Sequence, residues 1–529
     1  MNIAIFRCLL SFCIVFSCSC QKKEMCATKP IQSICINFIY NPLSLDPRKC
    51  TDPVTTVLNF MLYEGLTRLE PDGNISMALA ERVQISKDRK TYIFHLKKCK
   101  WSDGTPITAH DFEASWKYIL DPHVPSKAAF LLFSIKNAKK AKRGECALEQ
   151  VGIRAIDDTQ LYVELNHPVP HFLELTSFCV YFPTPCNEQN IPYPPTMNTK
   201  FSGPFMLQSW IDNDEVIVKK NPYYWNRQEV CLDEIHATII KDEATALKLY
   251  EQGYLDWIGG LISPLPLDAL PDLKTKSNLN QHPIAGTTFS SFNIHSYPFN
   301  NTNIRKAFSY AICRRSIVEN ISQMFEDIAT GPVPHVFKGK NPASLFSDCA
   351  AEQAKFHLAL GLQELGITKE EFPKIVYHYF TSELQRNLAL HLQNVWKHVL
   401  GLKVELQCNE LKTHLAKLHH RDFQIAQMSW IGQYYDRMSF LERFQTQDAF
   451  RNYSKWENSH YNQLIEQSFY KEGEERNHLL DQAEAIIANE MPIIPLYHYH
   501  LIYIKNPHLQ NIMISPLGDI QFHKAFLTH

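Results

Sequence analysis

The sequence has 529 residues and a formal net charge of −2, with 45% hydrophobic and 20% charged residues. This length exceeds what one hydrophobic core organises, so two or three lobes are expected. The charge balance has no basic excess and gives no sign of nucleic-acid binding. The 31 phenylalanines, 23 tyrosines and 8 tryptophans suit a core, and also a cleft that holds an organic ligand between aromatic rings.

The first twenty residues have the pattern of a secretory signal peptide. Arg7 precedes an apolar run from Cys8 to Phe16, and small residues follow from Ser17 to Cys20. The run is shorter than the ~20 residues that a membrane-spanning helix needs. The end of this segment resembles a bacterial lipoprotein processing site, although the usual leucine three residues before the cysteine is absent. We expect a lipoprotein-type signal peptide over 1–20 with Cys20 lipidated; lipidation of Cys18 and an ordinary cleaved signal stay open.

The rest of the chain is expected outside the cytoplasm, in the periplasm or cell envelope. No later apolar stretch is long enough to span a bilayer. The 15 cysteines include no C-x-x-C pair, so a zinc module is not expected. Export permits disulfides. Cys179 and Cys186 are close enough in sequence to bridge a proline-containing turn, and the odd number of cysteines after Cys20 leaves at least one free thiol.

The folded part is expected to begin with a strand and a helix. Ile34–Tyr40 has the composition of a buried strand, which Asn41-Pro42 ends. A polar turn over 43–47 follows, in which proline restricts the backbone. Val54–Tyr63 is predicted to be a helix, with Gly65 in the left-handed position that commonly closes a helix.

A hairpin turn, a strand and a capped helix are predicted next. Asp72-Gly73 is a two-residue turn signal between strand-like segments. Thr91–Leu96 alternates between apolar and other residues and predicts a strand, and Asp103-Gly104 predicts a turn. Thr108 is a suitable N-cap for a helix that runs through Trp116.

The second half contains a stretch that looks like one wall of a ligand cleft. Thr302–Asn320 and Ser382–Leu400 are strongly helix-like and flank a Pro- and Gly-containing segment, 331–342. Further on, Asp422–Ala426 predicts a strand, and Met428–Asp436 then supplies an aromatic residue, a glycine and polar side chains. Ligands in α/β domains usually lie beyond strand ends, so we expect this stretch to face a ligand.

Short motifs follow one another in order along the whole mature chain. They are Leu45-Asp46-Pro47, Tyr63-Glu64-Gly65-Leu66, Leu79-Ala80-Glu81, Trp101 to Phe112, Asp157 to Leu161, Gly203-Pro204-Phe205, Asn221 to Asn226, Pro298 to Asn301, Ile304 to Phe308, and Ile494 to Tyr497. This series resembles the bacterial extracellular solute-binding proteins of the peptide and nickel class (family 5). The resemblance is closest to the periplasmic oligopeptide-binding proteins, which are receptors of ABC importers.

The resemblance implies an α/β, periplasmic binding protein-like fold, with two hinged ligand-binding lobes plus an inserted third lobe (class II type). The expected ranges are 33–54, 190–285 and 500–529 for lobe I, 55–189 for the inserted lobe II, and 286–499 for lobe III. The implied function is that of a receptor that captures oligopeptides between the lobes by hinge closure. The expected partners are a peptide ligand and the permease and ATPase subunits of an ABC importer; the receptor itself is expected to be a monomer.

The resemblance also implies which residues meet the ligand. An extended peptide would pair its main chain with two strand-like segments, Tyr40–Leu43 and Ser429–Ile431. The candidate ligand-binding residues are Tyr40, Asn41, Pro42, Leu43, Ser429, Trp430, Ile431, Gln433, Asp436, Arg421 and Tyr499.

Several of these positions depart from the family pattern. Gln433 stands three residues after Trp430, where the family has a carboxylate that captures the α-ammonium of the ligand. A buried charge left without its partner costs roughly 3–5 kcal/mol, or about two to four orders of magnitude in affinity. Asn41 replaces another acidic residue, and Pro42 has no amide donor. Family basic, histidine and tryptophan positions fall on Gln385, Gln427, Leu418 and Leu411.

Two explanations of these departures stay open. In the first, neighbouring residues take over: Asp436 binds the amine, while Arg421, Lys417 or Arg386 binds the carboxylate. In the second, the ligand is an N-blocked peptide, a cell-wall-derived peptide or a non-peptide metabolite.

The sequence offers no catalytic motif. No nucleophile elbow, phosphate loop or paired-carboxylate pattern stands out, so no catalytic residue, no cofactor and no enzymatic activity are expected. The 23 histidines leave one alternative. Alternation on a strand would place His498 and His500 on one face, and His419-His420 are adjacent, so a receptor for a metal or a metal complex such as nickel is the alternative, with no metal ligand assigned.

Overall fold

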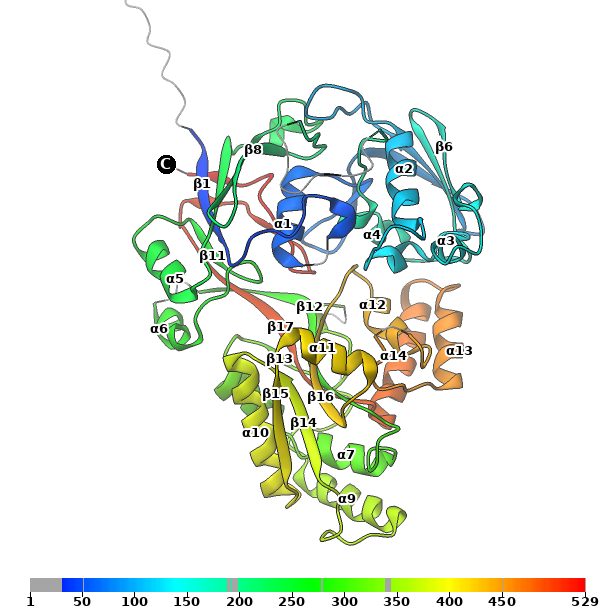
Figure 1. Ribbon diagram of the computed structural model, residues 1–529, viewed down its shortest axis with the longest axis vertical. Coiled ribbons are helices and arrows are strands. Elements are labelled where there is room, and N and C mark those ends of the chain that lie inside the picture. The colour runs from blue at the N-terminus through cyan, green and yellow to red at the C-terminus, as the bar shows by residue number, and fades with distance from the viewer. Residues whose placement is uncertain are drawn as a thin grey trace, which may run out of the picture. The chain divides into compact units, whose positions relative to one another are not determined.

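A large mixed β-sheet organises the fold (Figure 1). The computed structural model describes residues 31–50, 52–187, 191, 198–276, 279–337, 344–449 and 451–528. Within these ranges the largest sheet has 11 strands. In spatial order they are β15 (Val404–Asn409), β14 (Ile375–Phe380), β16 (Ile425–Ile431), β12 (Asn280–Phe292), β17 (Ile493–Lys505), β11 (Trp257–Gly259), β1 (Ser33–Phe38), β10 (Glu234–Ile239), β9 (Glu215–Lys220) and β8 (Phe205–Ile211), with β13 (Asp327–Ile328) paired to β17.

Strands β12 and β17 connect the two halves of this sheet. Each has 13 residues, and they pair antiparallel from Asn280↔Tyr503 to Ser291↔Ile493, with register shifts on the way. In Figure 1 they run from the half with β1, β8 and β11 to the half with β14, β15 and β16. The expected boundaries at 285/286 and 499/500 fall inside these two strands. Because Gln32–His529 packs as one compact unit, the division into three lobes stays a prediction.

The half of the sheet around β14 is covered by helices with one apolar face. They are α7 (Thr302–Tyr310), α8 (Arg314–Ile317), α9 (Ala351–Leu365), α10 (Glu383–Val399) and α11 (Leu411–His420). Leu388, Leu392 and Trp396 of α10 recur every fourth residue and are fully buried, and the Trp396 indole donates to the carbonyl of Phe308 at 2.9 Å. The predicted helix over 382–400 is confirmed. The helix predicted over 302–320 is interrupted after Tyr310.

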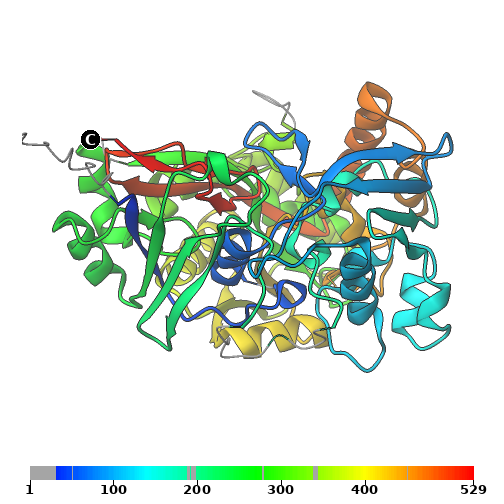
Figure 2. The ribbon, with the colours of Figure 1, turned by 90° about the horizontal axis from the view of Figure 1, so that it is seen from above.

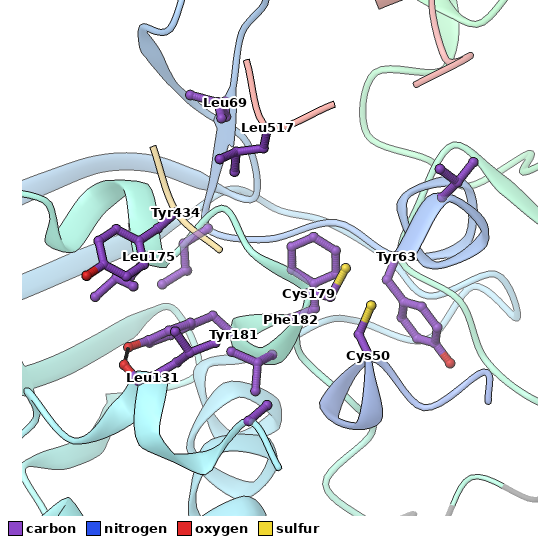
Figure 3. Packing of buried hydrophobic residues seen from close by; sticks show 14 of the residues in the cluster. Cys50, Tyr63, Leu69, Leu131, Leu175, Cys179, Tyr181, Phe182, Tyr434 and Leu517 are labelled. Carbon is purple, nitrogen blue, oxygen red and sulfur yellow. Dashed lines mark hydrogen bonds between the residues drawn. The ribbon is translucent and has the colours of Figure 1, made fainter. Parts of the chain in front are cut away.

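The segment from α1 to residue 187 forms a second layer with its own sheet. It contains α1 (Pro53–Leu62), the pair β2 (Thr67–Leu69) and β3 (Ile75–Met77), a four-stranded sheet of β4 (Ala80–Ile85), β5 (Thr91–Leu96), β7 (Gln160–Glu164) and β6 (Ile153–Asp157), and the helices α2 (Ala109–Leu120), α3 (Ala138–Lys142) and α4 (Phe172–Leu175). The predicted N-cap is confirmed, because Thr108 and Asp111 form a capping box at the start of α2. Trp116 of α2 packs edge-on against Tyr181, which Figure 3 shows inside the apolar core.

The remaining elements complete the two halves. They are α5 (Glu243–Glu251), α6 (Leu270–Thr275), α12 (Met438–Leu441), α13 (Ser459–Ser468), α14 (Gly473–Glu490), and the strand pairs β18 (Leu509–Gln510) with β21 (Phe526–Leu527) and β19 (Met513–Ile514) with β20 (Ile520–Gln521). Figure 2 shows the C-terminal strands beside β1, and the Gln32 side chain accepts from the amide of Leu527 at 2.7 Å. The C-terminal hairpins therefore belong to the half that begins the chain.

Gly65 does not have the role that its position predicts. Helix α1 ends at Leu62 with an extended Tyr63 (φ −130°), and Gly65 is absent from the described residues with positive φ. A Cβ at Gly65 would lie 2.7 Å from both the Phe182 ring and the Thr176 carbonyl oxygen. Close packing, rather than a left-handed backbone, requires glycine here.

The predicted Cys179–Cys186 bridge is wrong. Cys179 is a buried free thiol and Cys186 an exposed one. The disulfide of the described residues joins Cys313 and Cys349. The Cys179 sulfur lies in the core facing Cys50 (Figure 3), with which it interacts. In both the disulfide and the Cys50–Cys179 contact the two cysteines lie far apart in the sequence, so the spacing of cysteines alone does not predict either pair.

The predicted signal peptide and its Cys20 lie outside the described residues. Among the residues that are described, no helix combines the length and apolar character that a membrane crossing requires.

The disulfide predicts a measurable contribution to stability. Replacing Cys313 and Cys349 together by serine should lower the free energy of unfolding by about 2–4 kcal/mol, because the unfolded chain gains the entropy of an open loop. Urea unfolding of the non-reduced protein measures this change. As a control, Cys186→Ser with Cys231→Ser removes two exposed free thiols and should change stability little. Equal stability of both double variants would contradict the disulfide.

Candidate functional site

A cavity of about 310 Å³ is lined by six separate parts of the described chain. Its lining includes 429–433 at the end of β16 and 517–520 at the turn between β19 and β20. Around the start of α1 it includes Cys50, Asp52, Pro53, Thr56 and Val57. The Ala285 peptide links two of these walls: its amide donates to the Pro516 carbonyl at 2.7 Å, and its carbonyl accepts from the Gly432 amide at 2.8 Å. The volume lies at the lower end of the range for small-molecule sites.

The stretch predicted as a ligand wall does line this cavity, but part of it is strand. Ser429–Ile431 belong to β16, which pairs with β12 through Thr288↔Ser429 and Gly286↔Ile431. The strand predicted from the sequence ended at Ala426, whereas β16 continues to Ile431. The prediction ended too early because Gln427 and Ser429 interrupt the apolar pattern. The Trp430 indole donates to the Ser439 carbonyl at 2.9 Å, so helix α12 holds the ring at the cavity.

Arg451 is the cation of this wall. Its guanidinium lies 4.1 Å from the centre of the Trp430 ring and donates to Gln433 Oε1 at 3.2 Å. It also lies 5.0 Å from the Phe130 ring, which belongs to the segment between α1 and residue 187. Burial lowers the Arg451 pKa to about 10, despite the nearby Tyr453 and Glu442, so the group stays charged at neutral pH. Its direct contacts here are aromatic rings and a neutral amide, and the Glu442 carboxyl, whose pKa burial raises to about 7, lies nearby.

Two carboxyl groups line the same cavity. Asp519 follows the turn at Gly518 (φ 87°), and its Oδ2 accepts from the Ser515 hydroxyl at 3.1 Å. Burial raises the Asp519 pKa to about 6. Asp52 is the N-cap of α1, and its Oδ1 accepts from the Thr55 amide at 3.0 Å, while its Oδ2 is buried without a hydrogen-bond partner. Among the described residues neither carboxylate forms an ion pair.

Tyr499 supports the cavity wall from β17. Its hydroxyl donates to Ser429 Oγ at 2.9 Å and accepts from the Thr288 hydroxyl at 2.9 Å. Its ring fills the space beside Gly286, where a Cβ would lie 2.4 Å from it. Ser429 lines the cavity, so Tyr499 acts through the position of that strand.

The first predicted pairing segment lies beside the cavity and does not line it. Tyr40 reaches the site through its hydroxyl, which donates to Asp52 Oδ1 at 3.2 Å. The Asn41 side chain bonds to Asp212 at 2.6 Å, and the Leu43 amide donates to the Thr55 hydroxyl at 2.9 Å. Because Pro42 has no amide hydrogen, neither Pro42 nor Leu43 presents an open N–H donor to a ligand strand.

Asp436 is engaged by other residues of the protein. Arg476 donates to both of its oxygens at 2.7 Å, and the Met438 amide donates to Oδ1 at 2.8 Å. His171 lies 3.8 Å from Oδ1 and stacks flat on Tyr434 at 4.7 Å between ring centres. Burial pushes the Asp436 pKa up, but His171 and Arg476 outweigh it and hold the pKa below its ordinary value. The carboxylate therefore joins α14 to the segment that carries α4.

Other predicted charge partners also lie elsewhere. Arg421 caps α11 and donates to the Gln447 carbonyl at 2.9 Å, and Lys417 pairs with Asp422 at 2.7 Å. Gln427 and Gln385 hydrogen-bond to each other inside the fold. The cavity lining of the described residues includes Arg451 and Asp519 instead, and sequence reasoning missed both. A turn signal at Pro516–Gly518 was the available hint for Asp519.

The histidines that suggested a metal receptor lie against other side chains of the protein. His500 Nε2 lies 3.1 Å from Asp327 Oδ2, and His335 Nδ1 lies 3.6 Å from the same oxygen. His498 is buried and His419 packs on the Tyr453 ring. Within the described ranges, three ligand-type side chains with donor atoms inside 4.8 Å of one another occur at Cys313, Asp348 and Cys349, two of which form the disulfide.

Comparison with known proteins gives consistent matches over nearly the whole chain. The model for bacterial extracellular solute-binding proteins, family 5 Middle, matches residues 74–452. The oligopeptide-binding protein OppA of Bacillus subtilis is 36% identical over 502 residues, covering 93% of this chain and 92% of that protein. The solved murein tripeptide binding protein MppA of Escherichia coli has a TM-score of 0.81 at 26% identity, covering 95% of this chain and 99% of the other. OppA of Listeria monocytogenes, solved bound to peptide, has a TM-score of 0.77 at 26% identity, covering 95% and 100%. The predicted α/β, periplasmic binding protein-like fold is confirmed.

The Asp436–Arg476 pair predicts a loss of stability when it is broken. Both side chains are almost buried, at 12% and 11% exposure, so Asp436→Asn leaves a buried guanidinium without its counter-charge. The free energy of unfolding should fall by about 3–5 kcal/mol in urea titration. Asp481→Asn is the matched control, because Asp481 pairs with Arg437 but is 62% exposed, and it should cost at most about 1 kcal/mol. Similar losses in both variants would refute the structural role of Asp436.

Proposed function

We propose a peptide receptor on the premise that this chain belongs to the bacterial extracellular solute-binding proteins of family 5, as the family match and the 36% identical relative establish. The family resemblance of the sequence motifs is thereby confirmed. The protein is the substrate-binding receptor of an ABC importer, and its ligand class is short peptides.

The cavity beside Trp430 is the observation that carries this proposal. It lies at the strand end where the sequence predicted a ligand wall, and its lining comes from six separate parts of the described chain. Backbone of β16, an aromatic ring, a guanidinium and two carboxyl groups surround it. Such a set can hold an extended zwitterionic molecule through its main chain and its terminal charges. Because binding requires no bond to be made or broken, we assign no catalytic residue.

The long strands β12 and β17 supply a hinge for ligand capture. They cross between the halves of the sheet, and the Pro283–Thr287 register shift loosens the ladder beside the cavity. A peptide that contacts walls from both halves binds the closed arrangement better than an open one, and so shifts the population toward closure. The closed receptor then docks on the membrane permease, and ATPase subunits power the transport.

The location and state of the receptor follow from the same proposal. It works as a monomer in the periplasm or cell envelope, and acylation at Cys20 keeps it near the membrane. A single acyl chain gives only marginal membrane binding, so several chains are needed for firm anchoring.

Scattering and calorimetry with peptides test the proposed function. A mixture of short peptides built from alanine, leucine, phenylalanine and serine should reduce the radius of gyration in small-angle X-ray scattering, because the lobes close on the ligand. Trp430→Leu should weaken binding by at least about tenfold in calorimetry, since it removes a central aromatic contact. Trp210→Leu on β8 is the control and should bind as the wild type does. Absence of binding by the wild type would count against a peptide ligand.

A further inference from the structure

The environment of Gln433 is unsuited to a ligand ammonium. The Gln433 side-chain oxygen, the atom that would accept from an ammonium, already accepts from Arg451 at 3.2 Å. Arg451 is held in place by the Trp430 and Phe130 rings, so its positive charge stays at this end of the cavity. An ammonium beside Gln433 would face a like charge in a partly desolvated site, which is unfavourable. Asp436 cannot replace Gln433, because Arg476 occupies both of its oxygens.

Asp519 has the opposite character. Its carboxyl lines the same cavity, and its one side-chain hydrogen bond among the described residues comes from the neutral Ser515 hydroxyl. The Ser515 amide donates to the Asp519 carbonyl at 3.0 Å, and the Asp519 amide donates to Ser515 Oγ at 3.2 Å. The turn therefore fixes the direction of the carboxyl before any ligand arrives. A desolvated carboxylate without a cation gains most when a ligand supplies one.

Asp52 provides a second acceptor for the same cation. Its Oδ1 is fixed by the Tyr40 hydroxyl and the Thr55 amide, while Oδ2 is buried and has no hydrogen-bond partner. Asp52 lines the cavity at the N-terminus of α1. Asp52 thus brings a second carboxylate to the cavity that Asp519 lines, with one oxygen that no hydrogen bond of the protein satisfies.

We propose that Asp519, assisted by Asp52, binds the ammonium group of the ligand, and that Arg451 beside Gln433 binds an acidic group of the ligand. This inference rests on the proposed function of the cavity as a peptide site and names its ligand class: short peptides with a free amino terminus and a free acidic group. The charges are placed the other way round from the family pattern, in which the carboxylate stands at the position of Gln433.

Chemically blocked peptides test the assignment of each charge. The same mixture of short peptides is used in three forms: unmodified, N-acetylated and C-amidated. Because its side chains are uncharged, the terminal groups carry its only charges. The wild type should bind the free mixture about 10- to 100-fold more tightly than the acetylated one, as for a charge-assisted hydrogen bond. Asp519→Asn should abolish this preference, and Arg451→Gln should abolish the preference for free over amidated peptides. Asp448→Asn, which removes an exposed carboxylate from a neighbouring cavity, is the charge-matched control and should keep both preferences.

Two further measurements separate this site from the position of Gln433. Gln433→Glu should not increase the affinity for the free mixture, because the new carboxylate would pair with Arg451. The affinity of the wild type for the free mixture should rise about tenfold as the pH increases through the Asp519 pKa of about 6, since only the ionised carboxylate attracts an ammonium. Asp519→Asn should lose this dependence. The other titratable groups that line this cavity or interact with Asp519 are Cys50, Cys179, Asp52 and Arg451.

The outcomes distinguish this inference from the proposed function. If the wild type binds free and acetylated peptides equally, or if Asp519→Asn keeps the wild-type preference, the assignment of Asp519 is wrong while the receptor function stands. If the wild type binds none of the mixtures, the peptide function fails and the charge assignment fails with it. Circular dichroism of Asp519→Asn checks that the variant is folded. The pH dependence of peptide affinity in the wild-type protein tests the role of Asp519 without any variant.

Discussion

The peptide groups of Ala285 hold two walls of the binding cavity together. The Ala285 amide donates to Pro516, next to the turn that carries Asp519, and its carbonyl accepts from Gly432, next to Trp430 and Gln433. Ala285 lies in β12, inside the register shift against β17. Buried backbone groups must be paired, so these two bonds fix the ends of β16 and of the C-terminal turn to one strand. Both cavity walls are therefore hydrogen-bonded to the same residue, Ala285, in one of the two strands about which the sheet halves would rotate.

The charges in the cavity are held by structure that does not depend on a ligand. Arg451 is positioned by two aromatic rings and an amide, Asp519 by the Ser515 turn, and Asp52 by the helix that it caps. Each is a partly desolvated charge, and none has an ion-pair partner among the described residues. Such groups cost stability in the free protein and contribute affinity when a complementary ligand arrives. The Asp436–Arg476 pair, in contrast, is complete within the protein and contributes to stability.

Local patterns in the sequence predicted much of the secondary structure and one wall of the site. Periodicity found β1, β5, α1 and α10, and the Thr108 capping box marked the start of α2. Trp430 was placed at the cavity because the family motifs aligned around it. What failed depended on contacts between distant residues. The residues around Asp436 do not indicate that Arg476 binds it, and those around Asp519 do not indicate that it shares a cavity with Trp430. Contacts between residues distant in the sequence leave no periodic pattern in either segment. The Cys313–Cys349 pairing and the packing need of Gly65 were hidden for the same reason.

A crystal structure of the protein with a bound short peptide would locate the ligand's charged groups relative to Asp519 and Arg451. We expect the peptide in the cavity between Trp430 and residues 517–520, with its ammonium nitrogen within hydrogen-bond distance of an Asp519 oxygen and an acidic group on Arg451. A peptide whose ammonium lies on Gln433 or Asp436, or a peptide bound outside this cavity, would contradict this expectation.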